Sequence, residues 1–117
     1  MKYVDMYVFG SYLRESNIGI YRTLLRYNGH DKVISGTERS ENSIRMTMIA
    51  IIEGLRALKE PCNVTVYSQA DFFQKTQENG WKRKSNLDLW TLIDDKSAQH
   101  TVKYVWYTDI RSVFRGR

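Results

Sequence analysis

The stretch Ser43-Ile44-Arg45-Met46-Thr47-Met48-Ile49-Ala50-Ile51-Ile52-Glu53-Gly54-Leu55-Arg56-Ala57-Leu58 decides the fold of this chain. Its apolar residues recur at spacings of three and four, which is the period of an amphipathic helix: Ile44, Met48, Ile51, Ile52, Leu55 and Leu58. Asn42 or Ser43 can cap the amino end of this helix with its side-chain oxygen. We therefore predict a helix over residues 42–59, followed by the single proline of the chain, Pro61.

Length and composition predict one domain over residues 1–117, because a chain of 117 residues can bury one core and is too short for two. A hydrophobic content of 42% and a charged content of 26% are ordinary for a globular protein. No apolar run approaches the roughly 20 residues of a membrane span, and residues 1–5 do not resemble a signal peptide. Cys62 is the one cysteine, which favours a reducing, cytoplasmic location and no membrane association.

The net charge of +5 favours an anionic partner. Positive charge gathers in the tetrapeptide Trp81-Lys82-Arg83-Lys84 and again at Arg111, Arg115 and Arg117. A solvated loop and a frayed tail explain these two clusters equally well, so the charge alone does not decide between a binding surface and an ordinary one.

Alternating residues predict a first strand over residues 3–9, broken by Gly10-Ser11. Residues 18–27 form a second predicted strand, and Asn28-Gly29 is a strong hairpin dipeptide before a return strand over residues 33–36.

After the main helix, residues 64–67 are typical of a short buried strand. We expect helices over 71–78, ended by Asn79-Gly80, and over 87–94, and a last strand over 102–107. The order β-β-β-α-β-α-α-β describes a mixed sheet in an α/β domain.

Six landmarks in this order resemble bacterial-type ribonuclease H. They are the stretches 4–11, 24–29, 45–48, 57–67, 80–82 together with 86–90, and 100–106. The resemblance covers roughly residues 3–107. It implies an RNase H-like α/β fold, with a five-stranded mixed sheet and helices mainly on one face.

Members of this family hydrolyse the RNA strand of an RNA–DNA hybrid with two divalent metal ions, which a cluster of acidic side chains must hold. The resemblance places three of these acid positions on Phe9, Thr47 and Gln69. The fourth acid belongs to a C-terminal helix that we expect this chain to lack, and the family's catalytic-loop histidine falls near Ile110. The sequence therefore predicts a catalytically inactive relative, a pseudoenzyme with no metal pair and no cofactor.

Other carboxylates could in principle have taken over. Asp5 shares a strand face with Phe9 but lies roughly 13 Å from it, at about 3.3 Å per residue. Glu53 follows Thr47 by six residues, so it points elsewhere around the helix. Asp71 could lie near the old site alone, and Asp109 cannot be placed from the sequence. A residual nuclease with rearranged acids is thus the least favoured hypothesis, and the Phe9 ring would fill the cavity without offering a ligand oxygen.

One hypothesis for function is a binder of RNA–DNA hybrid or other nucleic acid that does not cleave it. The residues that the resemblance assigns to such a surface are Gly10, Ser11, Asn17, Asn42, Ser43, Trp81, Lys82, Arg83 and Lys84. Ile44 and Asp71 replace polar residues that are usual there, which weakens the case for hybrids in particular. Structural roles compete as well: Asn42 and Ser43 as helix caps, Trp81 and Trp90 as core anchors, and Arg45 in an internal ion pair.

The other hypothesis, which the sequence favours slightly, is a protein-interaction module. Without the family's final helix, one sheet face would be exposed, with residues from 4–8 and either Tyr104 and Trp106 or Val105 and Tyr107. Such an apolar patch normally marks an interface with a protein partner or a second copy of the chain. The segment 112–114 could cover a little of it. A compact, inactive copy of this kind would suit a phage or mobile-element factor that acts on a host component.

Overall fold

The computed structural model describes residues 1–40, 42–80 and 82–117. Five strands form one mixed sheet in the order β3-β2-β1-β4-β5. The strands are β1 (Lys2–Leu13), β2 (Ile18–Tyr27), β3 (His30–Arg39), β4 (Cys62–Ser68) and β5 (Thr101–Trp106). β1, β2 and β3 pair antiparallel, whereas β4 runs parallel to β1 and β5 runs parallel to β4. The predicted five-stranded mixed sheet is confirmed.

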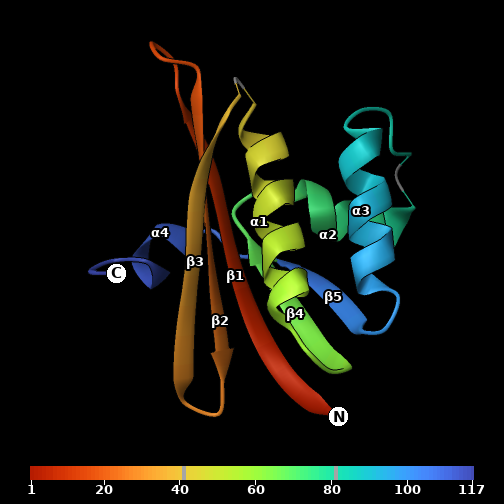
Figure 1. The fold of residues 1–117 in the computed structure, drawn as a ribbon. Coiled ribbons are helices and arrows are strands. Elements are labelled where there is room, and N and C mark those ends of the chain that lie inside the picture. The colour runs from red at the N-terminus through yellow and green to blue at the C-terminus, as the bar shows by residue number, and fades with distance from the viewer. Residues whose placement is uncertain (41, 81) are drawn as a thin grey trace.

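Within the described residues, three helices cover one face of this sheet and a fourth lies on the opposite face (Figure 1). The first three are α1 (Ser43–Ala57), α2 (Phe72–Asn79) and α3 (Leu87–Ser97). The fourth, α4 (Ile110–Val113), is a single turn that the sequence reasoning did not predict. The predicted order of elements is otherwise confirmed. No helix in the described part of the chain is long and apolar enough to cross a membrane.

The long helix α1 begins as its sequence predicts. The Asn42 side chain accepts hydrogen bonds from the backbone N–H groups of Ile44 and Arg45, at 2.9 and 3.1 Å. Asn42 is therefore the cap, and Ser43 is the first helical residue. The helix buries its apolar face against β1 and β2, where Met6, Val8 and Leu25 are all buried.

The strand β1 is longer than the sequence reasoning allowed. Gly10 and Ser11 were expected to end it, but they pair with Tyr21 and Ile20 of β2, and the strand continues to Leu13. Gly10 is instead the point of closest approach to α1, because a Cβ atom there would overlap the backbone nitrogen of Thr47. The Asn28-Gly29 hairpin is confirmed, and both residues have the positive φ angles of a two-residue turn.

Side chains of α2 cover the open edge of β5. Gln77 accepts a hydrogen bond from the Tyr104 N–H at 2.9 Å and donates one to the Val102 carbonyl at 2.8 Å. Gln74 accepts one from the Trp106 N–H. The two glutamines thus satisfy backbone groups of an edge strand that a neighbouring strand would otherwise satisfy, which guards the edge against pairing with another chain.

We expect Gln77→Ala to lower the free energy of unfolding by about 1–2 kcal/mol, because it removes two hydrogen bonds from this edge. Urea denaturation measures that loss, and amide hydrogen exchange at Tyr104 shows where it arises. The matched variant Gln77→Glu keeps an acceptor for the Tyr104 N–H but turns a carboxylate oxygen toward the Val102 carbonyl, so it should retain the protection of the Tyr104 amide that Gln77→Ala loses. Unchanged protection of the Tyr104 amide in Gln77→Ala would contradict this account.

Candidate functional site

A cleft of about 360 Å³ lies where β1 passes the amino end of α1. β1, α1, the residues after β4 and the short α4 all contribute to its walls. The lining residues are Val8, Phe9, Gly10, Ser11, Tyr12, Ser43, Ile44, Thr47, Gln69, Ala70 and Arg111.

The cleft exists because two parallel strands separate at this point. The pairing of β1 with β4 ends at Val8 and Ser68, whereas β1 continues to Leu13 with β2 alone. The Ser68 hydroxyl turns the chain away, since it donates to the Ala70 carbonyl and accepts from the Ala70 N–H. The edge of β1 beyond Val8 is therefore left facing open space, which is the usual location of a ligand site at the carboxyl ends of parallel strands.

The three positions that the resemblance assigns to the metal-binding acids meet in this cleft. Phe9, Thr47 and Gln69 all line it, although they are 38 and 22 residues apart in sequence. Thr47 is only 6% exposed, and its hydroxyl donates to the Ser43 carbonyl one turn earlier at 2.9 Å. Gln69 is exposed, and its backbone carbonyl accepts from the Trp106 indole N–H at 3.0 Å.

None of the described residues that line the cleft carries a carboxylate. The four acids considered from the sequence lie elsewhere: Asp5 accepts from the Tyr67 hydroxyl at 3.3 Å, Glu53 pairs with Arg56, Asp71 pairs with Lys75, and Asp109 precedes α4. Across the described part of the chain, no three His, Cys, Asp or Glu side chains are grouped so that they could hold a metal ion. The donor set of the cleft does not fit a pair of divalent cations, which require several carboxylate oxygens.

A cation enters the cleft instead. The guanidinium of Arg111 lies over the ring of Phe9, with its central carbon 5.0 Å from the ring centroid. Within residues 1–40, 42–80 and 82–117, Arg111 forms no ion pair, whereas Arg45, Arg83 and Arg117 each have a carboxylate partner. Sequence reasoning noted Arg111 only as part of a basic tail. The missed signal is the spacing of Ile110 and Phe114, four residues apart, which is typical of a helical turn with one apolar side.

Apolar contacts hold α4 against the sheet. Ile110 and Phe114 are buried together with Leu24 of β2, at 0%, 5% and 0% exposure. Ile110 is the position near which the resemblance places a catalytic histidine, and here it is a core anchor. These contacts fix the residue between them, Arg111, on the cleft side of the sheet edge.

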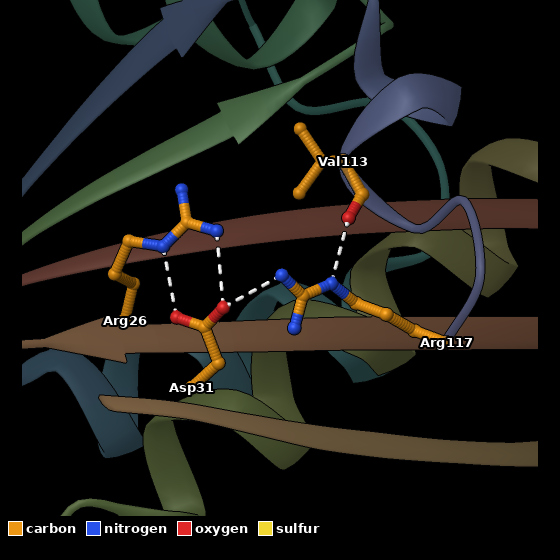
Figure 2. Close-up of polar contacts among 4 residues, drawn as sticks. All are labelled: Arg26, Asp31, Val113 and Arg117. Atoms are coloured by element: carbon orange, nitrogen blue, oxygen red, sulfur yellow. Dashed lines mark hydrogen bonds and ion pairs between the residues drawn. The ribbon is translucent and has the colours of Figure 1, made fainter. Parts of the chain in front are cut away.

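An ion-pair network ties down the residues after α4. Figure 2 shows Asp31 of β3 bound by two arginines: Arg26 at 2.8 and 3.1 Å, and Arg117 at 2.8 Å. The Arg117 Nε also donates to the Val113 carbonyl at 3.1 Å. Hydrogen bonds from Arg26, helped by the charges of both arginines, hold the pKa of Asp31 below its usual range. The stability from a lowered carboxyl pKa is lost only as the pH falls through the folded-state pKa, so this clamp persists at neutral pH.

The structure brings together only some of the residues that the sequence assigned to nucleic-acid binding. Gly10, Ser11 and Ser43 line the cleft. Asn42 is occupied as the cap of α1. Asn17 is a turn residue between β1 and β2 with a φ of 55°, and its carbonyl accepts from the Ser40 N–H at 2.8 Å, so it is no part of the cleft lining. Trp81 lies outside the described residues.

The basic loop borders a second hollow, of about 440 Å³, between α2 and α3. Lys82 and Arg83 line it together with the aromatic residues Phe73, Trp90 and Tyr104. Arg83 is held in place, because it pairs with Asp94 at 2.7 Å and lies 4.0 Å above the Trp90 ring. Burial raises the pKa of Tyr104 to about 12. Lys84 is exposed and, among the described residues, has no carboxylate partner.

A third, smaller hollow adjoins both the cleft and the hollow at the basic loop. It contains Ile44, which also lines the cleft, and Trp90, which also lines the hollow at the basic loop. Trp90 is 4% exposed and is a core anchor, as one interpretation of the sequence held. Arg45 forms the expected ion pair within the chain, with Asp88 at 2.7 Å. The cleft with Arg111 and the hollow with Lys82 therefore lie on either side of this third hollow.

The expectation of a large uncovered apolar sheet face is wrong in two respects. Val4, Met6, Val8 and Tyr104 belong to the core under α1, so the opposite face carries their neighbours. On that face α4 covers Leu24 and packs against Phe9, Tyr7 and Tyr67. The remaining positions are largely polar, including Asp5, Arg26, Asp31, Asn63, Thr65 and Lys103. On this outer face Tyr107 is 37% exposed, whereas Trp106, at 49% exposure, is in register with Ser68 and Val8 and so lies on the side that carries α2.

Comparison with known proteins agrees with this fold. The family model for RNase H matches residues 1–108. The ribonuclease H of Oleidesulfovibrio alaskensis is 36% identical over 120 aligned positions, which cover 91% of this chain and 78% of that protein.

Two solved structures share the fold. LC9-RNase H1, described as a type 1 RNase H with the type 2 active-site motif, superposes with a TM-score of 0.76 at 22% identity. The match covers 93% of this chain and 64% of that one, so this chain spans somewhat less than two thirds of that protein. LC11-RNase H1, solved in complex with an RNA/DNA hybrid, gives a TM-score of 0.75 at 11% identity, over 92% and 87% of the two chains. On the strength of the family match and the identity to its relatives, this chain belongs to the ribonuclease H family.

Proposed function

We propose that this domain binds nucleic acid without metal ions and does not cleave it. The observation that carries the proposal is the cleft at Phe9, Thr47 and Gln69, whose described walls contain no carboxylate and one arginine. A two-metal nuclease must hold two divalent cations on acidic oxygens beside the scissile phosphate. A site with a net positive charge and no such oxygens is suited to the phosphate and unsuited to the metals.

The arrangement of the hollows supports a polymer as the ligand. Positive charge lines two of them, at Arg111 and at Lys82, and the third hollow adjoins the first at Ile44 and the second at Trp90. Cations spaced along a groove favour a phosphate backbone, which offers a negative charge at regular intervals. The relative LC11-RNase H1 was solved with an RNA/DNA hybrid, so a hybrid is the first ligand to try. The relatives are named ribonuclease H, which by itself favours an enzyme. We propose otherwise because the described residues that line this cleft include no carboxylate.

Binding through protein contact, favoured at first from the sequence, loses its main argument because α4 covers the apolar centre of the outer face.

The test uses a short labelled RNA–DNA hybrid, with duplex DNA, duplex RNA and single strands as competitors. We expect a dissociation constant that rises steeply with salt and is the same in EDTA as in Mg²⁺, and an intact hybrid after incubation with Mg²⁺ or Mn²⁺. The ribonuclease H of O. alaskensis serves as the positive control for cleavage in the same buffers. Metal-dependent cleavage by the pure domain, or failure to bind any of these nucleic acids at low salt, would contradict the proposal.

A matched pair of double variants locates the contacts. Lys82→Ala with Lys84→Ala removes two cations from the basic loop and leaves the ion pair of Arg83 intact. Lys32→Ala with Lys59→Ala removes the same charge from positions outside both hollows. The first pair should reduce the slope of log K against log salt by about 2, and the second should leave the slope unchanged.

A further inference from the structure

Arg111 is exposed, and its guanidinium has the contacts and the location of an anion-binding group. Its guanidinium lines the cleft and, within the described part of the chain, is paired with no carboxylate. The guanidinium lies over the Phe9 ring, with its central carbon 5.0 Å from the ring centroid, and makes a cation–π contact with it. The N–H edge of a stacked guanidinium stays free to donate two parallel hydrogen bonds to an oxyanion. Phe9 therefore does more than fill the cavity, since it gives Arg111 a fixed platform.

The position of Arg111 is imposed by contacts on both sides of it. Ile110 and Phe114 are buried against Leu24, and the Arg117 carbonyl accepts a hydrogen bond from Arg22 at 2.6 Å. The Asp31 carboxylate then clamps the Arg117 side chain at 2.8 Å. A cation that is held before the ligand arrives loses less conformational entropy on binding than a free one.

Hydroxyl groups from two other elements face the same space. Ser11 of β1 and Ser43 of α1 both line the cleft, and neither hydroxyl is engaged in a hydrogen bond among the described residues. The Thr47 hydroxyl, in contrast, is already committed to the Ser43 carbonyl. One guanidinium and two hydroxyls, from three elements, suit a tetrahedral anion that presents oxygens in several directions.

We propose that Arg111, stacked on Phe9, binds one phosphate group in this cleft with the help of Ser11 and Ser43, so that a side chain of the domain supplies the positive charge there. This inference rests on the proposed function for its source of phosphate, a phosphodiester of nucleic acid. Free phosphate shares the chemistry and is the simpler probe. Arg111 is a binding residue, and Asp31 and Arg117 are positioning residues that act through it.

The first measurement titrates the ¹⁵N-labelled domain with inorganic phosphate and follows the arginine Nε–Hε signals by NMR. We expect a saturable shift of the Arg111 signal that Arg111→Ala abolishes, with chloride at equal ionic strength as the control. The matched variant Arg115→Ala removes a charge from the same tail, outside the cleft lining, and should leave the phosphate response intact. Asp31→Asn should weaken phosphate binding while the Arg111 signal remains, as a positioning role requires.

The second measurement couples Arg111 to one phosphate of the ligand. Each phosphate of the bound oligonucleotide is replaced in turn by an uncharged methylphosphonate. At one position we expect the affinity of the unaltered domain to fall about tenfold, the effect of one lost charge-assisted contact. Arg111→Ala should lose a similar factor with the natural ligand and nothing further with that substituted ligand. The Arg115→Ala variant should still lose the full factor in affinity when the phosphate at that position is replaced by methylphosphonate.

The outcomes separate this inference from the proposed function. Binding of oligonucleotides with no coupling between Arg111 and any phosphate, and no phosphate-dependent shift of its signal, would overturn the inference and leave the proposed function standing. A phosphate response at Arg111 without binding of any oligonucleotide would overturn the proposed function and support the phosphate site.

Discussion

Replacing Gly10 with alanine is expected to cost this domain a large part of its stability. The new Cβ atom would overlap the backbone nitrogen of Thr47 and lie 2.7 Å from the carbonyl carbon of Met46. Both are main-chain atoms of α1, so no side-chain rotation relieves the clash, and the helix itself must move away from β1. Overpacking of this kind costs about 3 kcal/mol or more, out of a total stability of roughly 5–15 kcal/mol for a typical domain.

Urea denaturation followed by circular dichroism measures this loss. Gly19→Ala is the matched control, because the Cβ atom there would meet only the side chain of Met46, with its Cγ 2.7 Å away. A methionine side chain is flexible and can give way, so the control should lose about 1 kcal/mol. If the two variants were equally stable, the close approach of β1 and α1 at Gly10 would not be the constraint that the structure indicates.

Introducing carboxylates into the cleft is expected to create a response to divalent metal, whereas we expect none from the natural protein. The triple variant Phe9→Asp, Thr47→Glu, Gln69→Asp would place three acids around a cleft of about 360 Å³. Without metal their mutual repulsion should lower the melting temperature. With Mn²⁺ at a hundred times its dissociation constant, the stabilisation should be about 2.7 kcal/mol, or on the order of 10 °C for a domain of this size.

Differential scanning fluorimetry with and without Mn²⁺ checks this, and EDTA should reverse the shift. The variant Phe9→Asn, Thr47→Gln, Gln69→Asn reproduces the shape of the three acidic side chains without their charge, so it should not respond to metal. A shift of the natural protein as large as that of the triple variant would mean that the cleft holds metal on other ligands. That result would also undermine the proposal that the domain acts without metal.

The elements of the fold could be predicted from the sequence because their signals are local. The three- and four-residue spacing of Ile44, Met48 and Ile51 places α1, and Asn28-Gly29 places a hairpin. The end of β1 was predicted wrongly, since glycine is read as a strand breaker when its neighbours are unknown. Gly10 stays in the strand because α1 lies against it and leaves no room for a side chain. That constraint comes from a residue 37 positions away.

The residues of the candidate site could likewise be predicted only in part from the sequence. The resemblance named Phe9, Thr47 and Gln69, and the structure does bring them to one cleft. Arg111 could not be assigned to that cleft from the sequence, because nothing near it in the chain says which face of the sheet α4 takes. The pairing of Arg117 with Asp31 and the burial of Ile110 and Phe114 on Leu24 settle this. These contacts link residues more than 80 positions apart.

What the sequence by itself determined is the identity of the side chains at three positions and the framework that carries them. Amphipathic spacing, a hairpin dipeptide and a capped helix are enough for that, because each depends on residues within a few positions of one another. Only the tertiary structure decided that the cleft around those positions is lined by an arginine and by no acid among its described residues, and that the outer sheet face is covered at its centre. The physical reason is that the charge and the burial of a site depend on every residue that folding brings close to it. Here β1, α1 and α4 come from distant parts of the chain.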